Sequence, residues 1–98
     1  MGVLGKYFKA PIDRKRYTIS YSDWLDTGEL VSTVTFEVTP TDAPPVVIDG
    51  IAVDPDGKGI VFYASGGVDG TSYKALATMT SSGGQTKEDT VLYSVKAP

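Results

Sequence analysis

Apolar and polar positions alternate with a period of two along much of the chain. In residues 29–38, ELVSTVTFEV, four apolar side chains fall on one face of an extended segment: Leu30, Val34, Phe36 and Val38. The other face carries mainly threonine and glutamate, and β-branched residues dominate the run. This pattern is typical of a half-buried β-strand. Residues 29–38 are therefore predicted to form a strand whose apolar face points toward a core.

Further runs of the same kind follow one another at short intervals. They are residues 16–21, 44–53, 58–64, 71–80 and 86–95. Turn signals separate them, notably DPDG at 54–57 and SSGG at 81–84, where glycine supplies the positive φ of a tight turn. No segment longer than about eight residues has the 3.6-residue period of a helix. About six or seven short strands with regular turns predict an antiparallel β-sandwich.

One motif makes the predicted fold more specific. In DGTSYKA, residues 69–75, an Asp-x-x-x-Tyr-x-small pattern opens the penultimate strand. Immunoglobulin-like domains have a tyrosine here whose hydroxyl bonds to upstream backbone, and Ala75 occupies the place of their second cysteine. We therefore expect an immunoglobulin-like sandwich with Tyr73 as a structural residue. Trp24 comes too early to be the central tryptophan of that fold and is expected to pack at its rim or between strands.

Charge divides the chain into two parts. Residues 1–20 contain five basic residues and one acid, whereas residues 21–98 contain four basic residues and eleven acids. The sequence is interpreted as a basic N-terminal arm, residues 1–16, and a sandwich domain, residues 17–98. The arm is either a solvated terminus or a segment that docks on an acidic protein surface. Nucleic acid is the least favoured partner, because the acidic body repels phosphate.

Tyr7 and Phe8 are expected to be the main contact residues of the arm. An aromatic pair outside the strands of a sandwich needs a surface to cover it, on its own domain or on a partner. The candidate partner contacts are Leu4, Lys6, Tyr7, Phe8, Lys9, Arg14, Lys15 and Arg16.

The residue inventory excludes most catalytic chemistry. The chain has no cysteine and no histidine, which excludes disulfides, thiolate or imidazole metal sites and histidine-based triads. The turn at Asp54 and Asp56 resembles the start of a calcium loop, but position twelve is Ser65 rather than glutamate. We expect a structural turn there, and cation binding stays an open alternative. The acids around Trp24 are expected to be surface turn residues.

No catalytic, cofactor-binding or metal-binding residue is therefore predicted, and the protein is not expected to be an enzyme. The glycine-rich segments match neither a Walker loop nor a dinucleotide fingerprint. No apolar run is long enough to span a membrane, and the first residues lack the apolar core of a signal peptide. We therefore expect a soluble protein with no export signal of its own.

From Tyr17 onward the chain resembles small structural proteins of tailed bacteriophages. The residues that carry the resemblance are YTISYSDWLDTGELVSTVTFEV and ASGGVDGTSYKALATMTSSGGQTKEDTVLYSV. The resemblance implies an immunoglobulin-like virion component without enzymatic activity, cofactor, nucleic acid or membrane partner. The expected function is capsid decoration, in which the arm and a sandwich edge dock on the head. The alternative is a binding module of a tail or head fibre that recognises a host-surface carbohydrate or receptor.

The resemblance also implies the partners and the place of the protein. The expected partners are the major capsid protein or other virion proteins. The expected place is the capsid surface or the tail, after synthesis in the host cytoplasm. Many copies on a shell, or a homo-oligomer, would gain affinity by multivalency, so that each contact can be weak.

Overall fold

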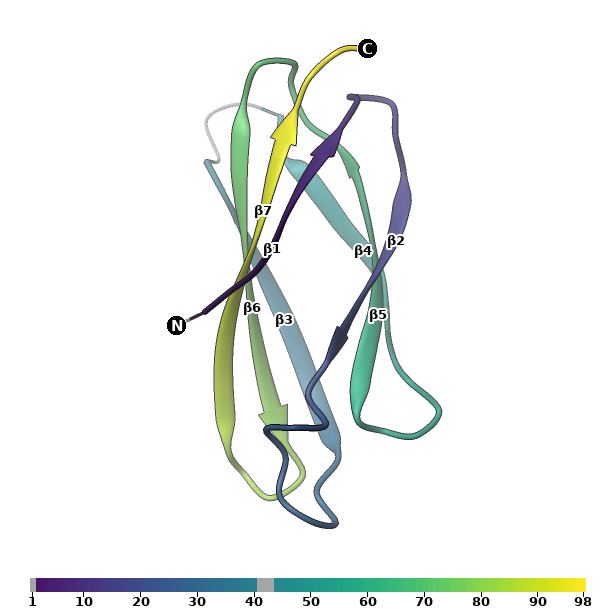
Figure 1. Ribbon diagram of the computed structural model, residues 1–98, viewed down its shortest axis with the longest axis vertical. Coiled ribbons are helices and arrows are strands. Elements are labelled where there is room, and N and C mark those ends of the chain that lie inside the picture. The colour runs from purple at the N-terminus through teal and green to yellow at the C-terminus, as the bar shows by residue number, and fades with distance from the viewer. Residues whose placement is uncertain (1, 41–43) are drawn as a thin grey trace.

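The computed structural model describes residues 2–40 and 44–98, with side chains from Gly5 onward in the first strand. Two β-sheets pack face to face in a body of 43 × 23 × 17 Å (Figure 1). The strands are β1 (Gly2–Lys9), β2 (Lys15–Ser20), β3 (Val31–Thr39), β4 (Val46–Val53), β5 (Gly59–Gly66), β6 (Ser72–Ser81) and β7 (Thr86–Val95). One sheet has the order β1-β7-β6-β3, and the other has the order β2-β5-β4. No helix that could cross a membrane occurs in the described residues.

The predicted all-β sandwich is confirmed. The strand order is consistent with an immunoglobulin-like arrangement, because the second, fifth and fourth strands form one sheet and the third, sixth and seventh share the other. All of these neighbours pair antiparallel. Connections between strands lie at the two ends of the body (Figure 1). The end that holds the β1–β2 and β5–β6 loops is called the upper end below, and the end with the β2–β3 loop and the β6–β7 hairpin is called the lower end.

The first strand is the main difference from the sequence prediction. Residues 2–9 do not form an arm outside the sandwich but pair with β7, and this pairing is parallel rather than antiparallel. The predicted boundary after residue 16 also falls inside β2. The physical reason is that β7 otherwise has a free edge, and the aromatic residues of β1 suit an extended conformation against it.

The core lies between the sheets and is built from alternating inward residues. On β6 the predicted alternation is confirmed, since Tyr73, Ala75, Ala77 and Met79 are almost fully buried. Facing aromatic rings fill the centre, with centroids 5.8 Å apart for Tyr17 and Phe62 and 4.7 Å apart for Phe36 and Phe62. The small alanines leave room for these rings. Trp24 packs against the core while partly buried, as expected of a rim residue.

A register shift modifies the predicted faces of β3. Val34, Phe36 and Val38 pack against the core as predicted, but Leu30 is 45% exposed and Val31 is buried instead. The pairing of β3 with β6 has an irregularity between Val31 and Thr33. Because one extra residue reverses the facing of a strand, the prediction for Leu30 was wrong.

Tyr73 forms the corner that its sequence motif suggests. Its hydroxyl accepts a hydrogen bond from the Val68 amide at 2.9 Å and donates one to the Pro44 carbonyl at 3.0 Å. The two bonds connect the start of β6 to the β5–β6 loop and to the segment before β4. Tyr73 thereby fixes two connections at the upper end of the sandwich.

Candidate protein-binding surface

The pairing of β1 with β7 decides where the sequence-predicted contact residues lie. Successive residues of a strand point to opposite faces of the sheet, so β1 sends Tyr7 and Lys9 toward the interior and Lys6 and Phe8 outward. The backbone of Leu4 lies in β1, and its side chain lies outside the described residues. The predicted contact residues are thus distributed over several faces.

Lys9 is a buried structural residue. It is only 5% exposed, and its ammonium group donates to the carbonyls of Gly66 at 2.6 Å and Ala10 at 2.7 Å. Burial lowers the pKa of Lys9, and the nearby Asp13 partly offsets this effect. The prediction that Lys9 contacts a partner is therefore corrected, because its charge is used to hold the end of β1 against the end of β5.

Tyr7 packs at the rim of the core. Its ring centroid lies 4.7 Å from that of Tyr17 and 5.9 Å from that of Tyr93, and the residue is 38% exposed. The surface that covers most of Tyr7 is therefore its own domain, which leaves only one edge of the ring for a partner.

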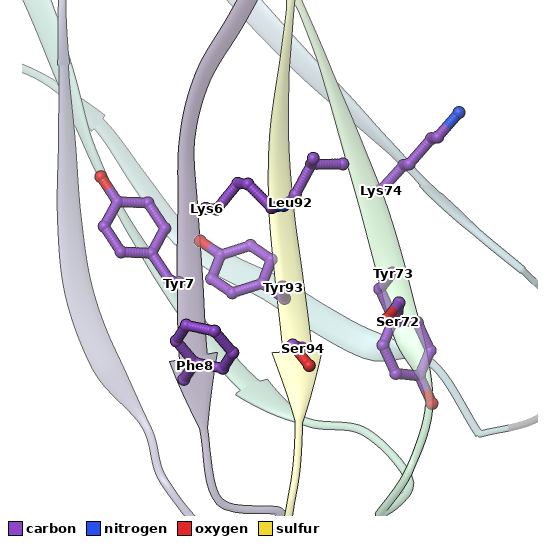
Figure 2. Close-up of a pocket in the computed structure, with 9 residues that line it drawn as sticks. All are labelled: Lys6, Tyr7, Phe8, Ser72, Tyr73, Lys74, Leu92, Tyr93 and Ser94. Atoms are coloured by element: carbon purple, nitrogen blue, oxygen red, sulfur yellow. The ribbon is translucent and has the colours of Figure 1, made fainter.

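Phe8 is the most exposed aromatic side chain in the described part of the chain. It is 82% exposed and stands on the outer face of the β1-β7-β6-β3 sheet. Lys6 pairs in register with Leu92, and Leu92 with Lys74, so these three form one row across the sheet. Phe8 pairs with Ser94 in the next row. Figure 2 shows these side chains along a shallow depression of about 340 Å³ on β1, β7 and β6.

A second depression adjoins Phe8 at the upper end. Its volume is about 260 Å³, and its lining includes Phe8, Lys96 and Pro98. The acid in this lining, Asp13, accepts a hydrogen bond from the Ala10 amide at 3.0 Å, which closes the β1–β2 turn. Phe8 therefore lies between the two depressions, and each depression has lysine in its lining.

The remaining basic residues of the predicted arm lie on the other sheet. Arg14 bonds to Asp49 at 2.8 Å, and its guanidinium lies 4.1 Å from the centre of the Tyr63 ring. Lys15 and Arg16 begin β2 and are exposed. The basic side chains of residues 1–16 thus do not form a single surface patch.

Sequence reasoning found Lys6 and Phe8 but missed Lys74, Leu92 and Lys96. The alternation of residues 71–80 already placed Lys74 on the outward face, opposite Tyr73. Joining these residues to Phe8 required the parallel pairing of β1 with β7, for which no local sequence signal exists.

Acidic groups at the lower end are used to hold loops together. Glu29 accepts hydrogen bonds from the Ser81 hydroxyl at 2.7 Å, the Asp26 amide at 3.0 Å and the Gln85 side chain at 3.0 Å. These bonds lower the pKa of Glu29, the Ser81 bond most of all. They join the β2–β3 loop to the β6–β7 hairpin. Two of the predicted surface turn acids, Asp26 and Glu29, therefore hold these loops together.

The DPDG turn has the geometry of a structural turn. The Gly57 amide donates to the Asp54 carbonyl at 2.8 Å, and an Asp56 carboxylate oxygen accepts from the Lys58 amide at 3.0 Å. Across residues 2–40 and 44–98, no group of three or more potential metal-binding side chains lies close together. The turn is thus explained by its own hydrogen bonds.

Three buried polar atoms have no hydrogen-bond partner among the described residues. They are the hydroxyls of Tyr21 and Tyr93 and one carboxylate oxygen of Asp89. The other Asp89 oxygen pairs with Lys87 at 3.0 Å. Burial raises the pKa of Tyr21 to about 12, with a further contribution from Asp89, and burial also raises the pKa of Tyr93.

Comparison with solved structures gives a weak fold likeness. The chain is similar to a Vibrionaceae Photobacterium sp. JT-ISH-224 2,6-sialyltransferase, crystallised in a ternary complex with CMP and lactose, at a TM-score of 0.48 and 15% identity. The match covers 98% of this chain but 18% of the enzyme, so the chain spans less than a fifth of that protein's length. A likeness at this level carries no argument about activity. None of the curated proteins matches the sequence.

A protein-family model gives the decisive match. The model for the podophage GP4 fiber-tail adaptor protein gp77 matches residues 9–94, which extend from the end of β1 almost to the end of β7. This family description supports the expected phage virion protein but does not mention the capsid, so capsid decoration has no support from it. The chain belongs to the gp77 family of podophage fiber-tail adaptor proteins and is a structural protein of the bacteriophage virion.

Proposed function

We propose that the protein is a non-enzymatic adaptor that joins a fibre to the tail of a podophage virion. The observation that carries this proposal is the family match over residues 9–94. The match includes six of the seven strands for most or all of their length, so it concerns the sandwich itself rather than an appended segment.

The shape and the surface of the domain suit an adaptor. A rigid sandwich 43 Å long offers contact surfaces that are well separated from each other. The upper end and the adjoining outer face of the β1-β7-β6-β3 sheet expose Phe8 among lysines, whereas the lower end carries bonded acidic loops. Such different surfaces allow two unlike proteins to be bound without competition.

An edge of the other sheet adds a further exposed apolar area. β4 forms that edge, and its residues Val47, Ile51 and Val53 are each between 41% and 47% exposed. Interfaces between subunits commonly use exposed apolar positions of this kind. This distribution supports a protein whose purpose is binding to other proteins.

Phage particles made without this protein test the proposal. We expect particles from a phage whose gene for this chain is interrupted to have intact heads and tails but no fibres, and to lose adsorption to host cells. Addition of the purified protein, together with fibre protein, should restore the fibres. Electron microscopy of the particles is the measurement, and gold-labelled protein should appear at the junction of tail and fibre.

The same images separate the adaptor from capsid decoration. Gold label distributed over the head, with fibres still present on particles that lack the protein, would overturn the adaptor function. Particles that lose head stability but keep their fibres would have the same consequence.

A further inference from the structure

The surface around Phe8 combines one strongly exposed aromatic side chain with three lysines. This surface, called the Phe8 surface below, consists of Lys6, Phe8, Lys74, Leu92 and Lys96. Its residues come from β1, β6, β7 and the segment after β7, and they line the two adjoining depressions. An exposed aromatic side chain at the centre of a patch is the kind of residue that dominates binding energy once a partner covers it.

The charges of the Phe8 surface all have the same sign. Lys6, Lys74 and Lys96 are exposed, and within the described residues none of their ammonium groups forms an ion pair. The depression over Lys6, Leu92 and Lys74 has no acid in its lining. Glu37 lies one row further along the same face, and Asp13 is bonded within its own turn. A negatively charged partner surface is therefore complementary to the Phe8 surface.

We propose that the Phe8 surface binds an acidic surface of another virion protein, which receives the Phe8 ring in an apolar pocket. The inference rests on the proposed adaptor function, and it identifies one of the two binding surfaces and the chemistry of its partner. The lysines attract and orient the partner, and the Phe8 ring supplies the apolar contact that holds it.

A protein partner fits this surface better than nucleic acid or a second copy of this chain does. The whole chain has a net charge of −3, which opposes approach to a phosphate backbone, and Phe8 is flanked by Leu92 rather than by further stacking aromatics on the outer face. The chain's own acidic end is a poor match, since Glu29 and Asp26 are already bonded within it.

Binding to particles that lack this protein tests the inference. Labelled wild-type protein is added to such particles, and the bound fraction is measured over a range of protein and salt concentrations. We expect Phe8→Ala to weaken binding by about tenfold or more. Because Phe8 is 82% exposed, this variant should keep the melting temperature of the wild type. Ile12→Ala, at a similarly exposed apolar position of the β1–β2 turn that lines neither depression, is the matched apolar control and should bind normally.

A pair of double charge reversals tests the role of the lysines. K6E/K74E and K15E/R16E both take the net charge from −3 to −7, because each change lowers it by two. We expect K6E/K74E to weaken binding by about tenfold at low salt and to reduce its salt dependence, while K15E/R16E has a much smaller effect. Equal losses for both variants would overturn the inference, since they would show a general charge effect.

The outcomes distinguish failure of this inference from failure of the adaptor function. If wild-type protein binds at the tail and restores fibres, but Phe8→Ala and K6E/K74E do so equally well, the inference is wrong and the adaptor function stands. If wild-type protein binds only to heads, the adaptor function is wrong. Sedimentation that shows a dimer lost in Phe8→Ala, or DNA binding lost in K6E/K74E, would assign the surface to a different occupant and overturn the inference.

Discussion

At the scale of single residues, three buried tyrosines differ in what their hydroxyls do. The hydroxyl of Tyr73 has two backbone partners, whereas those of Tyr21 and Tyr93 have none among the described residues. A buried polar group without a partner loses its hydration and gains nothing in return. The stability of the domain should therefore depend on these hydroxyls in opposite ways.

We expect Tyr73→Phe to lower the free energy of unfolding by about 1–3 kcal/mol, because two hydrogen bonds are lost. Tyr93→Phe should change it by less than about 0.5 kcal/mol or increase it, because no bond is lost and an unpaired hydroxyl is removed. Chemical denaturation of the two variants measures both values. They form a matched pair, since Tyr73 and Tyr93 are register neighbours and both are 1% exposed. Equal losses in the two variants would contradict this account.

At the scale of elements, β1 is part of the fold rather than an appendage. It contributes the rim contact of Tyr7 with Tyr17 and Tyr93, the buried ammonium of Lys9, and the backbone bond from the Lys96 amide to the Lys9 carbonyl at 2.9 Å. Its removal would expose the edge of β7 and one side of the Tyr93 ring. An unpaired edge of this kind also promotes aggregation.

Deletion of residues 1–9 should accordingly destabilise the domain by roughly 2–4 kcal/mol, from the lost aromatic packing and the lost bonds to β7. Thermal unfolding followed by circular dichroism measures the effect. Phe8→Ala is the control, because Phe8 is exposed and its loss should leave the melting temperature unchanged. A deleted protein that melts with the full chain would show that the segment is an arm after all.

The elements also show how far the sequence can predict this fold. Strands such as β6 were predicted because alternation and turn glycines are local signals, and the corner at Tyr73 has its own motif. β1 was not predicted because its partner lies at the other end of the chain, so its pairing depends on tertiary structure. The same limit applies to the binding surface: Lys6 and Phe8 could be proposed from sequence, but their neighbours Lys74 and Leu92 are set by register across three strands.

At the scale of the whole molecule, the two ends of the sandwich are built differently. The upper end presents Phe8 to solvent beside cationic side chains, and the lower end is closed by a network around Glu29. In that network the Glu29 carboxylate joins the β2–β3 loop, which connects the two sheets, to the β6–β7 hairpin. Both ends are therefore held by side-chain hydrogen bonds, the upper one through Tyr73 and Lys9 and the lower one through Glu29.

The Glu29 network makes the stability of the domain depend on pH. Its hydrogen bonds hold the pKa of Glu29 below the usual value of 4.5, so the ionised form is favoured in the folded state. The resulting stabilisation is fully present above the pKa of the unfolded chain, and it is lost as pH falls through the lower folded pKa. We expect Glu29→Gln to be less stable than wild type at pH 7, with the difference shrinking as the pH is lowered from about 5 toward 3.

Denaturation of both proteins across this pH range measures the difference, which isolates Glu29 from the other acids. Asp23→Asn is the control, because Asp23 lies in the same loop but outside the Glu29 network, so this variant should keep the stability of the wild type at pH 7. Gly83→Ala provides an independent test: a Cβ at this position would overlap the Glu29 carboxylate, and the variant should lose stability at pH 7 together with part of the pH dependence. A constant difference between Glu29→Gln and wild type from pH 7 to pH 3 would show that the network stabilises by packing and not by charge.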